Sequence, residues 1–257
     1  MARVNGTGRV ALVTGAGRGI GRATALLLAA RGERVMGVAR SRDELDRLAA
    51  EAPIEVMAES VATPEGCERI VRATQERLGP ISILVNNAGI GSYHETVIWE
   101  QDPDTWRESL AVNLDAAFHL IRLSAPDMVQ ARWGRIVIVS STAGQVGAPA
   151  IAAYSAAKHG VIGLMRSAAQ DLIPYGVTCN AVCPGWVKTT MAAADAAEQA
   201  RRTGRTVDEV WDENARSYAA GRVMEPEEIA DVIGYLTSEG ATALNGEAIT
   251  VALGGLW

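Results

Sequence analysis

The sequence is poor in aromatic residues, cysteine and histidine. Aromatic side chains make up 5% of its 257 residues, and phenylalanine occurs once. The core must therefore consist mainly of alanine, valine, leucine and isoleucine, which suits helices packed closely on a parallel sheet. The three cysteines, Cys67, Cys179 and Cys183, match neither a disulfide framework nor a zinc site, because no histidine or second cysteine pair accompanies them. We expect no metal and a reducing cytoplasm.

Basic charge and long apolar runs are also scarce. The formal net charge is −6, so the chain lacks the basic footprint that nucleic-acid binding requires. No apolar run is as long as a membrane span, and the N-terminal residues lack the apolar region of a secretory signal. The sequence therefore predicts a cytoplasmic protein that binds neither nucleic acid nor membrane.

Short apolar runs alternate with helical patterns along most of the chain. Strands buried on both faces read as continuous apolar runs, and their alternation with helices predicts a doubly wound parallel α/β sheet with helices on both faces. We expect one domain over 1–257, in which Pro126 bends or ends a long helix. The polar segment at about 190–222 is expected to be a substrate lid or an ordinary surface excursion. Seven strands are predicted, at 9–15, 34–40, 54–60, 81–89, 134–141, 176–185 and 247–253.

The segment TGAGRGIG, residues 14–21, directly follows the first predicted strand and opens a helix. Gly15 allows a tight turn, Gly19 lets the backbone approach a pyrophosphate, and Gly21 permits close helix–strand packing. The helix N-terminus then offers free N–H groups to the phosphates. In this context the motif predicts a dinucleotide site in a Rossmann fold; a glycine-rich turn without a ligand is the alternative.

The end of the second predicted strand bears on the choice between NADP(H) and NAD(H). An acid there binds the ribose 2′-hydroxyl of NAD and repels a 2′-phosphate. This chain instead has Ala39, Arg40 and Arg42, and Arg18 in the glycine turn can reach the same phosphate. Because a guanidinium suits bidentate phosphate contacts, we expect NADP(H). NAD(H) is the alternative, if these arginines are only solvated.

Tyr154 and Lys158 are four residues apart in AYSAAKHG, residues 153–160, so one helix face carries both. A lysine beside a tyrosine favours the phenolate and suits proton transfer. The alternative is a surface aromatic residue beside a solvated charge. Ser141 ends a predicted strand, and Asn113 lies in an apolar helix where a buried amide needs hydrogen-bond partners. With both in place, the catalytic interpretation is favoured.

In order and spacing these motifs resemble the single-domain short-chain dehydrogenases/reductases, over essentially the whole chain. The ketoreductase-type members, including 3-oxoacyl and polyketide ketoreductases, are the most similar. The resemblance implies hydride transfer between a nicotinamide cofactor and a ketone or secondary alcohol, by an enzyme acting on CH–OH donors, and it implies a homotetramer. The motifs that carry it are TGAGRGIG, NNAG (86–89), Asn113 in AVNLDAAF, Ser141 in VSSTAG, YSAAK and PGWVKT (184–189).

The resemblance also implies roles for individual residues. Tyr154 would be the acid/base, and Lys158 its modulator and a ribose ligand. Ser141 would hold the substrate carbonyl, and Asn113 would anchor a water relay to Lys158. The expected substrate contacts, besides Ser141 and Tyr154, are His94, Gln145 and Trp186, with Val146 and Met191 as pocket walls. The expected cofactor contacts, besides Tyr154 and Lys158, are Gly15, Arg18, Gly19, Ile20, Gly21, Arg40, Val61, Asn87, Ala88, Gly89, Pro184, Gly185, Val187 and Thr189.

Two features depart from the family pattern. Ser60 ends the third predicted strand, where the family often has an aspartate near the adenine, so Val61 is expected to supply a backbone N–H instead. The segment ITVALGG, residues 249–255, is one residue longer than usual.

Three other functions compete with an NADP(H)-dependent carbonyl reductase. An NAD-dependent secondary-alcohol dehydrogenase is the nearest alternative. A sugar-nucleotide epimerase or dehydratase would need an added substrate domain, for which the chain has no room. A cofactor-sensing protein without catalysis is disfavoured by the intact Ser141, Tyr154 and Lys158.

Overall fold

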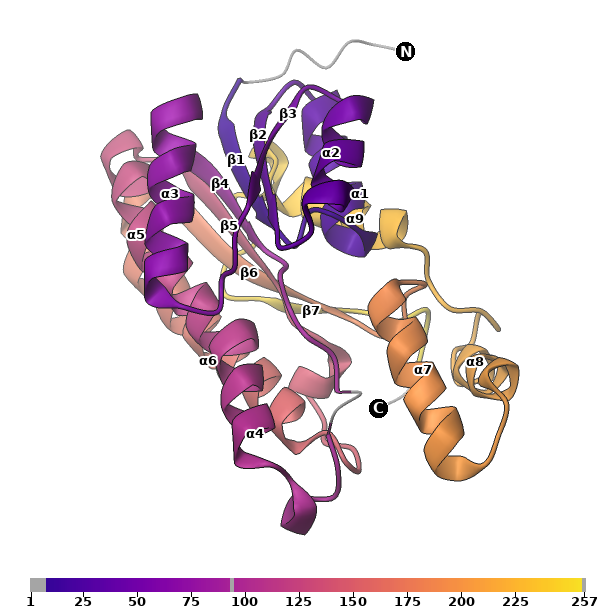
Figure 1. Ribbon diagram of the computed structural model, residues 1–257. Coiled ribbons are helices and arrows are strands. Elements are labelled where there is room, and N and C mark those ends of the chain that lie inside the picture. Colours follow the sequence, from indigo (N-terminus) through magenta and orange to yellow (C-terminus); the bar gives the residue numbers. More distant parts are fainter. Residues whose placement is uncertain (1–7, 93–94, 256–257) are drawn as a thin grey trace.

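The computed structural model describes residues 8–92 and 95–255, in which strands and helices alternate (Figure 1). The strands are β1 (Val10–Thr14), β2 (Arg34–Ala39), β3 (Ile54–Ala58), β4 (Ile81–Asn86), β5 (Gly134–Val139), β6 (Val177–Pro184) and β7 (Ala248–Val251). The α-helices are α1 (Gly19–Ala30), α2 (Arg42–Glu51), α3 (Pro64–Leu78), α4 (Pro103–Leu110), α5 (Ala116–Ala131), α6 (Ala152–Leu172), α7 (Thr190–Thr203), α8 (Val207–Arg216) and α9 (Pro226–Leu236).

The seven strands form one parallel sheet in the order β3-β2-β1-β4-β5-β6-β7. This confirms the predicted sheet. Every residue of β1, β5 and β6 is buried, as continuous apolar runs in a doubly covered sheet require. From β1 the chain first adds β2 and β3 on one side of the sheet and then adds β4 to β7 on the other side. A crevice is therefore expected at the carboxyl ends of β1 and β4.

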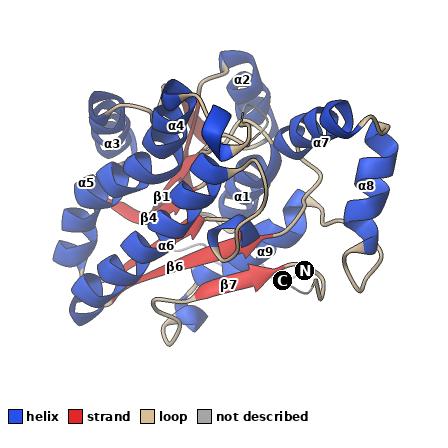
Figure 2. Ribbon diagram, turned by 90° about the horizontal axis from the view of Figure 1, so that it is seen from below, coloured by secondary structure: helices blue, strands red, loops and turns tan. Residues whose placement is uncertain are grey.

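Helices cover both faces of the sheet. Helices α3, α5 and α6 pack on one face, and α1, α2 and α9 pack on the other (Figures 1 and 2). Side chains alternate between these two cores along each strand, so Leu12 faces the first and Val13 the second. Each fully buried aliphatic side chain contributes about 1.5–3 kcal/mol, which makes these two layers the main source of stability.

The long helix expected after Asp102 is present, and Asp102 caps it by accepting from Thr105 N at 2.9 Å. It is not uniform, because a π-helical turn, Ala111–Asp115, joins α4 to α5. Pro126 does not end the helix, and that part of the prediction is wrong. Directly after it, the carboxylate of Asp127 accepts from Ile81 N and from the Gln75 side chain, both at 2.9 Å, and anchors α5 to β4 and α3.

Residues 190–222 contain two helices that stand apart from the layers of the sheet (Figure 1). Thr189 and Thr206 cap α7 and α8, and each hydroxyl accepts a backbone N–H of the first turn. The two helices share a small core of their own, which consists of Ala196, Ala200, Val210, Trp186 and Trp211.

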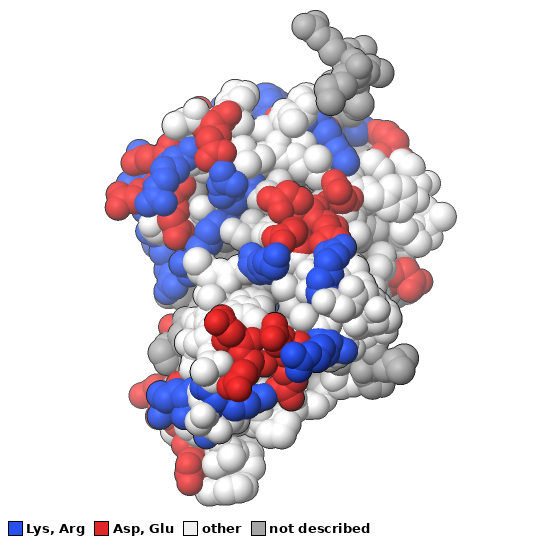
Figure 3. Space-filling view, turned by 90° about the vertical axis from the view of Figure 1, so that its right-hand side faces the viewer, with Lys and Arg blue, Asp and Glu red and all other residues white. Residues whose placement is uncertain are grey.

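On the face that carries α2, α7 and α8, small acidic clusters lie directly beside basic side chains (Figure 3). Basic and acidic side chains lie interleaved there, in ion pairs such as Arg22–Glu51 and Arg222–Glu228. Exposed pairs of this kind contribute about 0–1 kcal/mol each. Among the helices of the described residues, none has the length and apolar character needed to span a bilayer.

Candidate active site

A cleft of about 1030 Å³ opens at the carboxyl ends of the strands, where the sheet order reverses. Its walls come from the ends of β1, β2, β4, β5 and β6 and from the first turns of α1, α6 and α7. Open α/β sheets bind their ligands at this position. The cleft is at the upper end of the usual range for ligand sites, about 300–1,000 Å³, so it suits an extended ligand together with a second small molecule.

The turn between β1 and α1 leaves space and donors for a phosphate group. Gly15 and Gly19 have φ angles of 66° and 54°, in the region that favours glycine. A Cβ on Gly21 would lie 2.2 Å from the carbonyl oxygen of Gly15, so no side chain fits there. The first turn of α1 has no side-chain cap, and its N–H groups are therefore available to an anion. These residues fit a dinucleotide.

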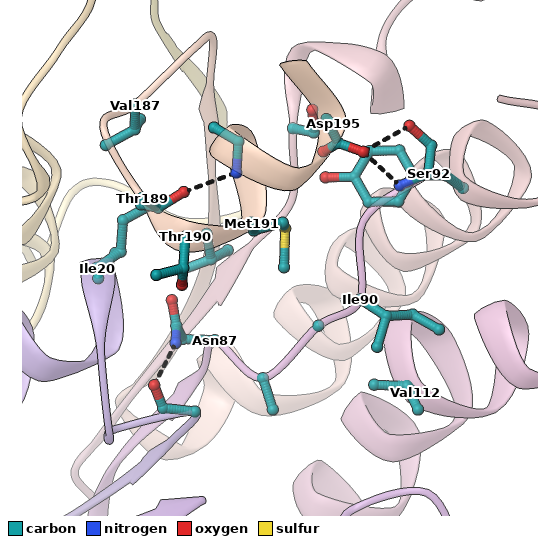
Figure 4. Close-up of a pocket in the computed structure, with 18 of the residues that line it drawn as sticks. Ile20, Asn87, Ile90, Ser92, Val112, Val187, Thr189, Thr190, Met191 and Asp195 are labelled. Atoms are coloured by element: carbon teal, nitrogen blue, oxygen red, sulfur yellow. Dashed lines mark hydrogen bonds between the residues drawn. The ribbon is translucent and has the colours of Figure 1, made fainter. Parts of the chain in front are cut away.

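Asn87 and Thr14 hold the end of β4 against this turn. The Asn87 side chain donates to the carbonyl oxygens of Thr14 and Gly15 at 2.9 and 3.3 Å, as Figure 4 shows in part. The Thr14 hydroxyl accepts from the backbone N–H groups of Asn87 and Ala88 at 3.1 and 3.0 Å. Thr14 was not among the predicted contacts, although it is the first residue of the motif TGAGRGIG.

Arg18 and Arg40 line the outer end of the cleft, together with an acid that the sequence did not single out. Arg18 forms an ion pair with Glu44, with 3.4 Å between Nη1 and Oε1. A Cβ on Gly17 would lie 2.7 Å from Glu44 Oε2, so this carboxylate covers the glycine turn. Arg42 pairs with Asp46 at 2.9 Å on α2 instead. The outer end of the cleft therefore carries charges of both signs.

Ser141, Tyr154 and Lys158 meet in the inner part of the cleft, and all three line it. The Ser141 hydroxyl hydrogen-bonds the phenol of Tyr154. Lys158 Nζ lies 5.5 Å from the centre of the Tyr154 ring and donates to the carbonyl oxygen of Val139 at 3.0 Å. Lys158 is 5% exposed, so its charge acts in a medium of low dielectric constant.

Burial dominates the ionisation of this pair. Burial, with smaller contributions from the carboxylates of Asp195 and Glu95, raises the pKa of Tyr154 to about 12, although the Ser141 hydrogen bond acts to lower this pKa. Burial lowers the pKa of Lys158 to about 8. The phenol form of Tyr154 therefore predominates at neutral pH, which suits a proton donor.

Asn113 lies in the π-helical turn, behind the cleft rather than in its lining. Its side chain accepts from Ile90 N and donates to Ile90 O, each at 3.2 Å, and it also donates to the Ser109 hydroxyl at 3.3 Å. A Cβ on Gly89 would lie 2.9 Å from Asn113 Oδ1 and 3.6 Å from Lys158 Nζ. Asn113 and Lys158 thus border one small space. The water relay through this space stays a prediction.

The segment after β6 forms the wall opposite the glycine turn. A Cβ on Gly19 would lie 3.1 Å from the Thr189 methyl group, while the Thr189 hydroxyl accepts from Ala192 N at 3.1 Å. In Figure 4, Thr189 and Thr190 lie near Ile20 and Asn87. Predicted residues from this wall that line the cleft are Pro184, Gly185, Trp186, Val187, Thr189 and Met191.

Most of the other predicted residues also line the cleft. Gly21 does not line the cleft; its lack of a side chain instead lets α1 pack closely against the turn at Gly15. Gln145 is not in the lining: its side chain accepts from the Thr250 hydroxyl at 2.9 Å and donates to Ala248 O at 3.5 Å. Polar groups of β7 turn it away from the cleft, so the structure does not support its prediction as a substrate contact. His94 lies outside the described residues. The remaining lining residues from the prediction are Gly15, Gly19, Ile20, Val61, Asn87, Ala88, Gly89 and Val146.

Two carboxylates near Tyr154 were not predicted from the sequence. Asp195 of α7 accepts from the N–H and the hydroxyl of Ser92 at 3.1 and 3.3 Å (Figure 4). Glu95 accepts from Ala153 N and Tyr154 N, both at 2.8 Å. These partners are 103, 58 and 59 positions apart in the chain, and no sequence motif contains either acid.

The chain matches the short chain dehydrogenase family over residues 9–200. It is 37% identical over 252 residues to a 3-oxoacyl-(acyl-carrier-protein) reductase of Vibrio cholerae, with 96% of this chain and 97% of that protein covered. Identity to a D-beta-hydroxybutyrate dehydrogenase of Cupriavidus necator is 34% over 245 residues, covering 93% and 94%. The structure of a variant of actinorhodin polyketide ketoreductase with NADPH has a TM-score of 0.91 and 34% identity, and 99% of each chain is covered.

Proposed function

Because the chain belongs to the short-chain dehydrogenases, we propose that it reduces ketones to secondary alcohols with NADPH and that Tyr154 is the acid/base. One observation carries the proposal: Ser141, Tyr154 and Lys158 meet in a cleft whose other end is a glycine cradle suited to phosphates. The 3-oxoacyl reductase and polyketide ketoreductase relatives support a keto group as the reacting group.

The side chains divide the work of the reaction. A bound nicotinamide coenzyme supplies the hydride. The Ser141 hydroxyl donates a hydrogen bond to the carbonyl oxygen, and Tyr154 donates its proton to the same oxygen as negative charge develops there. The cation of Lys158 stabilises the phenolate that remains. The space bordered by Lys158 and Asn113 holds the water through which Tyr154 regains its proton. In alcohol oxidation the phenolate accepts the proton instead.

The proposed coenzyme is NADP(H). Arg18 and Arg40 line the cleft near the end of β2, where a 2′-phosphate would need cations. The polyketide ketoreductase of similar structure, which was solved with NADPH, supports this choice. Glu44 is an argument against NADP(H), because its carboxylate lies beside Gly17 and forms an ion pair with Arg18. NAD(H) is therefore the second candidate coenzyme.

The proposal extends to the whole chain as one catalytic domain, a cytoplasmic homotetramer with residues 190–222 as its substrate lid. Support for the lid comes from Met191 and Asp195 of α7, which line the cleft. Support for assembly comes from Trp106 and Phe118, which are 36% and 46% exposed on α4 and α5 and offer apolar surface to another copy. Cys67, Cys179 and Cys183 are free thiols, which suits a reducing compartment.

A turnover screen of ketones and secondary alcohols with NADPH and NADH in parallel tests the proposal. Reduction of at least one ketone class, with a higher kcat/KM for NADPH than for NADH, is the expected result. A higher kcat/KM for NADH would assign the second candidate coenzyme. Tight coenzyme binding with no turnover of any carbonyl or alcohol would instead support the cofactor-sensing alternative.

A further inference from the structure

The helix that carries Tyr154 begins without a cap of its own. The N-cap residue of α6 is Ile151, which forms no side-chain hydrogen bond with the first turn. The first N–H groups of a helix have no partner within the helix, and a buried donor left unpaired costs about 1–3 kcal/mol. Another part of the chain must therefore accept from Ala153 and Tyr154, the second and third residues of α6.

Glu95 accepts from both residues. Its Oε2 accepts from Ala153 N and its Oε1 from Tyr154 N, each at 2.8 Å. Glu95 is 3% exposed, and burial raises the pKa of its carboxyl group while the two N–H groups act to lower it. The carboxylate also lies at the positive end of the dipole of α6. Because each oxygen has its own donor, Glu95 fixes the Tyr154 backbone in both position and direction.

The loop that carries Glu95 is itself joined to helix α7. Ser92 donates its N–H and hydroxyl to Asp195 Oδ1 at 3.1 and 3.3 Å, and the Ser92 carbonyl accepts from Glu95 N at 2.8 Å. Figure 4 shows Asp195 and Ser92 turned toward each other beside the pocket. Two carboxylates therefore link α7, the loop after β4 and the start of α6.

We infer that Glu95 is a positioning residue for Tyr154 and that Ser92 and Asp195 couple this position to helix α7. The inference rests on the proposed function, which gives Tyr154 its role. A movement of α7 over a substrate shifts the loop through Ser92, and the loop shifts the start of α6 through Glu95. A displacement of about 1 Å at a reacting group can change a rate about 100-fold, so this linkage is strong enough to matter.

Glu95 also acts on the charge of the phenol. The groups that face Tyr154 are Lys158 on its own helix, Ser141 after β5, Glu95 on the loop and Asp195 on α7. Both carboxylates disfavour the phenolate, so removal of the Glu95 charge lowers the pKa of Tyr154. Alcohol oxidation needs the phenolate and should then begin at a lower pH.

Glu95→Gln tests the position and the charge together. The amide offers one acceptor oxygen and turns a donor toward the second backbone N–H. We expect kcat for ketone reduction to fall about 10- to 100-fold, the Kd for NADPH to stay unchanged, and the pH profile of oxidation to move to lower pH. Glu100→Gln, an exposed glutamate after the same strand, is the matched control and should behave as the wild type.

Two outcomes would overturn the inference. One is a wild-type kcat with an unshifted pH profile. The other is a parallel loss of kcat and NADPH binding without a pH shift, which indicates a general structural role for Glu95. Tyr154→Phe, measured alongside, separates the two proposals. If Tyr154→Phe stays active, the proposed function fails; if it is inactive while Glu95→Gln behaves as the wild type, only the inference fails.

Amide hydrogen exchange of the wild-type protein tests the same contact without any variant. The Ala153 and Tyr154 amides should be protected, because Glu95 accepts from both. The first-turn amides of α1, at Gly19 and Ile20, provide the comparison, since no side chain caps that helix. Exchange at Ala153 and Tyr154 as fast as at Gly19 and Ile20 would overturn the inference even if Glu95→Gln does not fold.

Discussion

At the scale of single residues, burial acts in opposite directions on the two ionisable groups of the site. It raises the pKa of Tyr154 and lowers that of Lys158, because a low dielectric constant disfavours the charged form of either group. At neutral pH the phenol therefore keeps its proton, as carbonyl reduction requires. The phenolate forms only as the pH approaches the pKa of Tyr154.

The two reaction directions should therefore depend differently on pH. Reduction uses the phenol, which is populated below the pKa of Tyr154, so its rate should not fall between about pH 6 and 8. Oxidation uses the phenolate, whose fraction rises with pH up to that pKa, so its rate should rise over about pH 7–10. Initial rates in both directions test this. An oxidation rate that falls across that range would contradict the assignment of Tyr154.

Glu44 should weaken the preference for NADPH. Its carboxylate lies beside Gly17 and pairs with Arg18, so it repels a 2′-phosphate and competes with it for the guanidinium. Glu44→Gln should lower the KM for NADPH several-fold and leave the KM for NADH unchanged. Glu51→Gln, which breaks the neighbouring pair with Arg22, is the control. Equal changes for both coenzymes would show that Glu44 does not act on the 2′-phosphate.

At the scale of elements, the π-helical turn between α4 and α5 shapes the back of the site. It brings the Asn113 side chain to the backbone of Ile90, beside Gly89 and Lys158. Turns of this kind occur often at functional sites. The space between Asn113 and Lys158 exists only because residue 89 has no side chain.

Gly89→Ala should therefore impair proton return to Tyr154. The added Cβ would lie 2.9 Å from Asn113 Oδ1 and 3.6 Å from Lys158 Nζ. We expect kcat to fall by roughly 10²-fold, the lower end of the range for lost proton-transfer catalysis, with a smaller change in the Kd for NADPH. Gly163→Ala on α6, where a Cβ meets nothing within 4 Å, should keep full activity and raise stability by about 0.5–1 kcal/mol. An unchanged kcat in Gly89→Ala would contradict the relay.

Element types could be predicted because local signals and burial agree. The predicted strands overlap all seven observed strands, with ends that differ by at most three residues, since apolar runs mark strands buried on both faces. Pro126 shows where a local rule fails, because α5 continues beyond it, anchored to β4 and α3 by the contacts of Asp127. The π-helical turn could not be predicted, because no local signal in the sequence marks it.

At the scale of the whole molecule, parallel strands explain why the sequence could predict that most of the candidate site residues lie in one cleft. Their carboxyl ends meet at one edge of the sheet, so motifs that follow strands converge there. Glu95, Asp195 and Glu44 could not be predicted in the same way. Their positions depend on the path of a loop, the placement of α7 and the tilt of α2, none of which a spacing rule specifies. Gln145 is a different case. It lies close to Ser141 in sequence, but its side chain bonds Thr250 and does not line the cleft.

The oligomeric state is also a property of the whole molecule. Trp106 and Phe118 expose apolar surface on α4 and α5, and an oligomer would bury it. Sedimentation velocity should give about four times the chain mass of 27.1 kDa. The double variant Trp106→Glu/Phe118→Glu should dissociate the assembly. A wild-type mass equal to one chain would contradict the proposed tetramer.

The central claim is that Tyr154 donates the proton in ketone reduction. Its most direct test is the rate of NADPH-dependent ketone reduction by the wild type and by Tyr154→Phe, with Tyr175→Phe at an exposed tyrosine as the control. The account predicts a kcat lower by about 10²–10⁴-fold in Tyr154→Phe, with NADPH binding retained and Tyr175→Phe fully active. Reduction by Tyr154→Phe at the wild-type rate would contradict it.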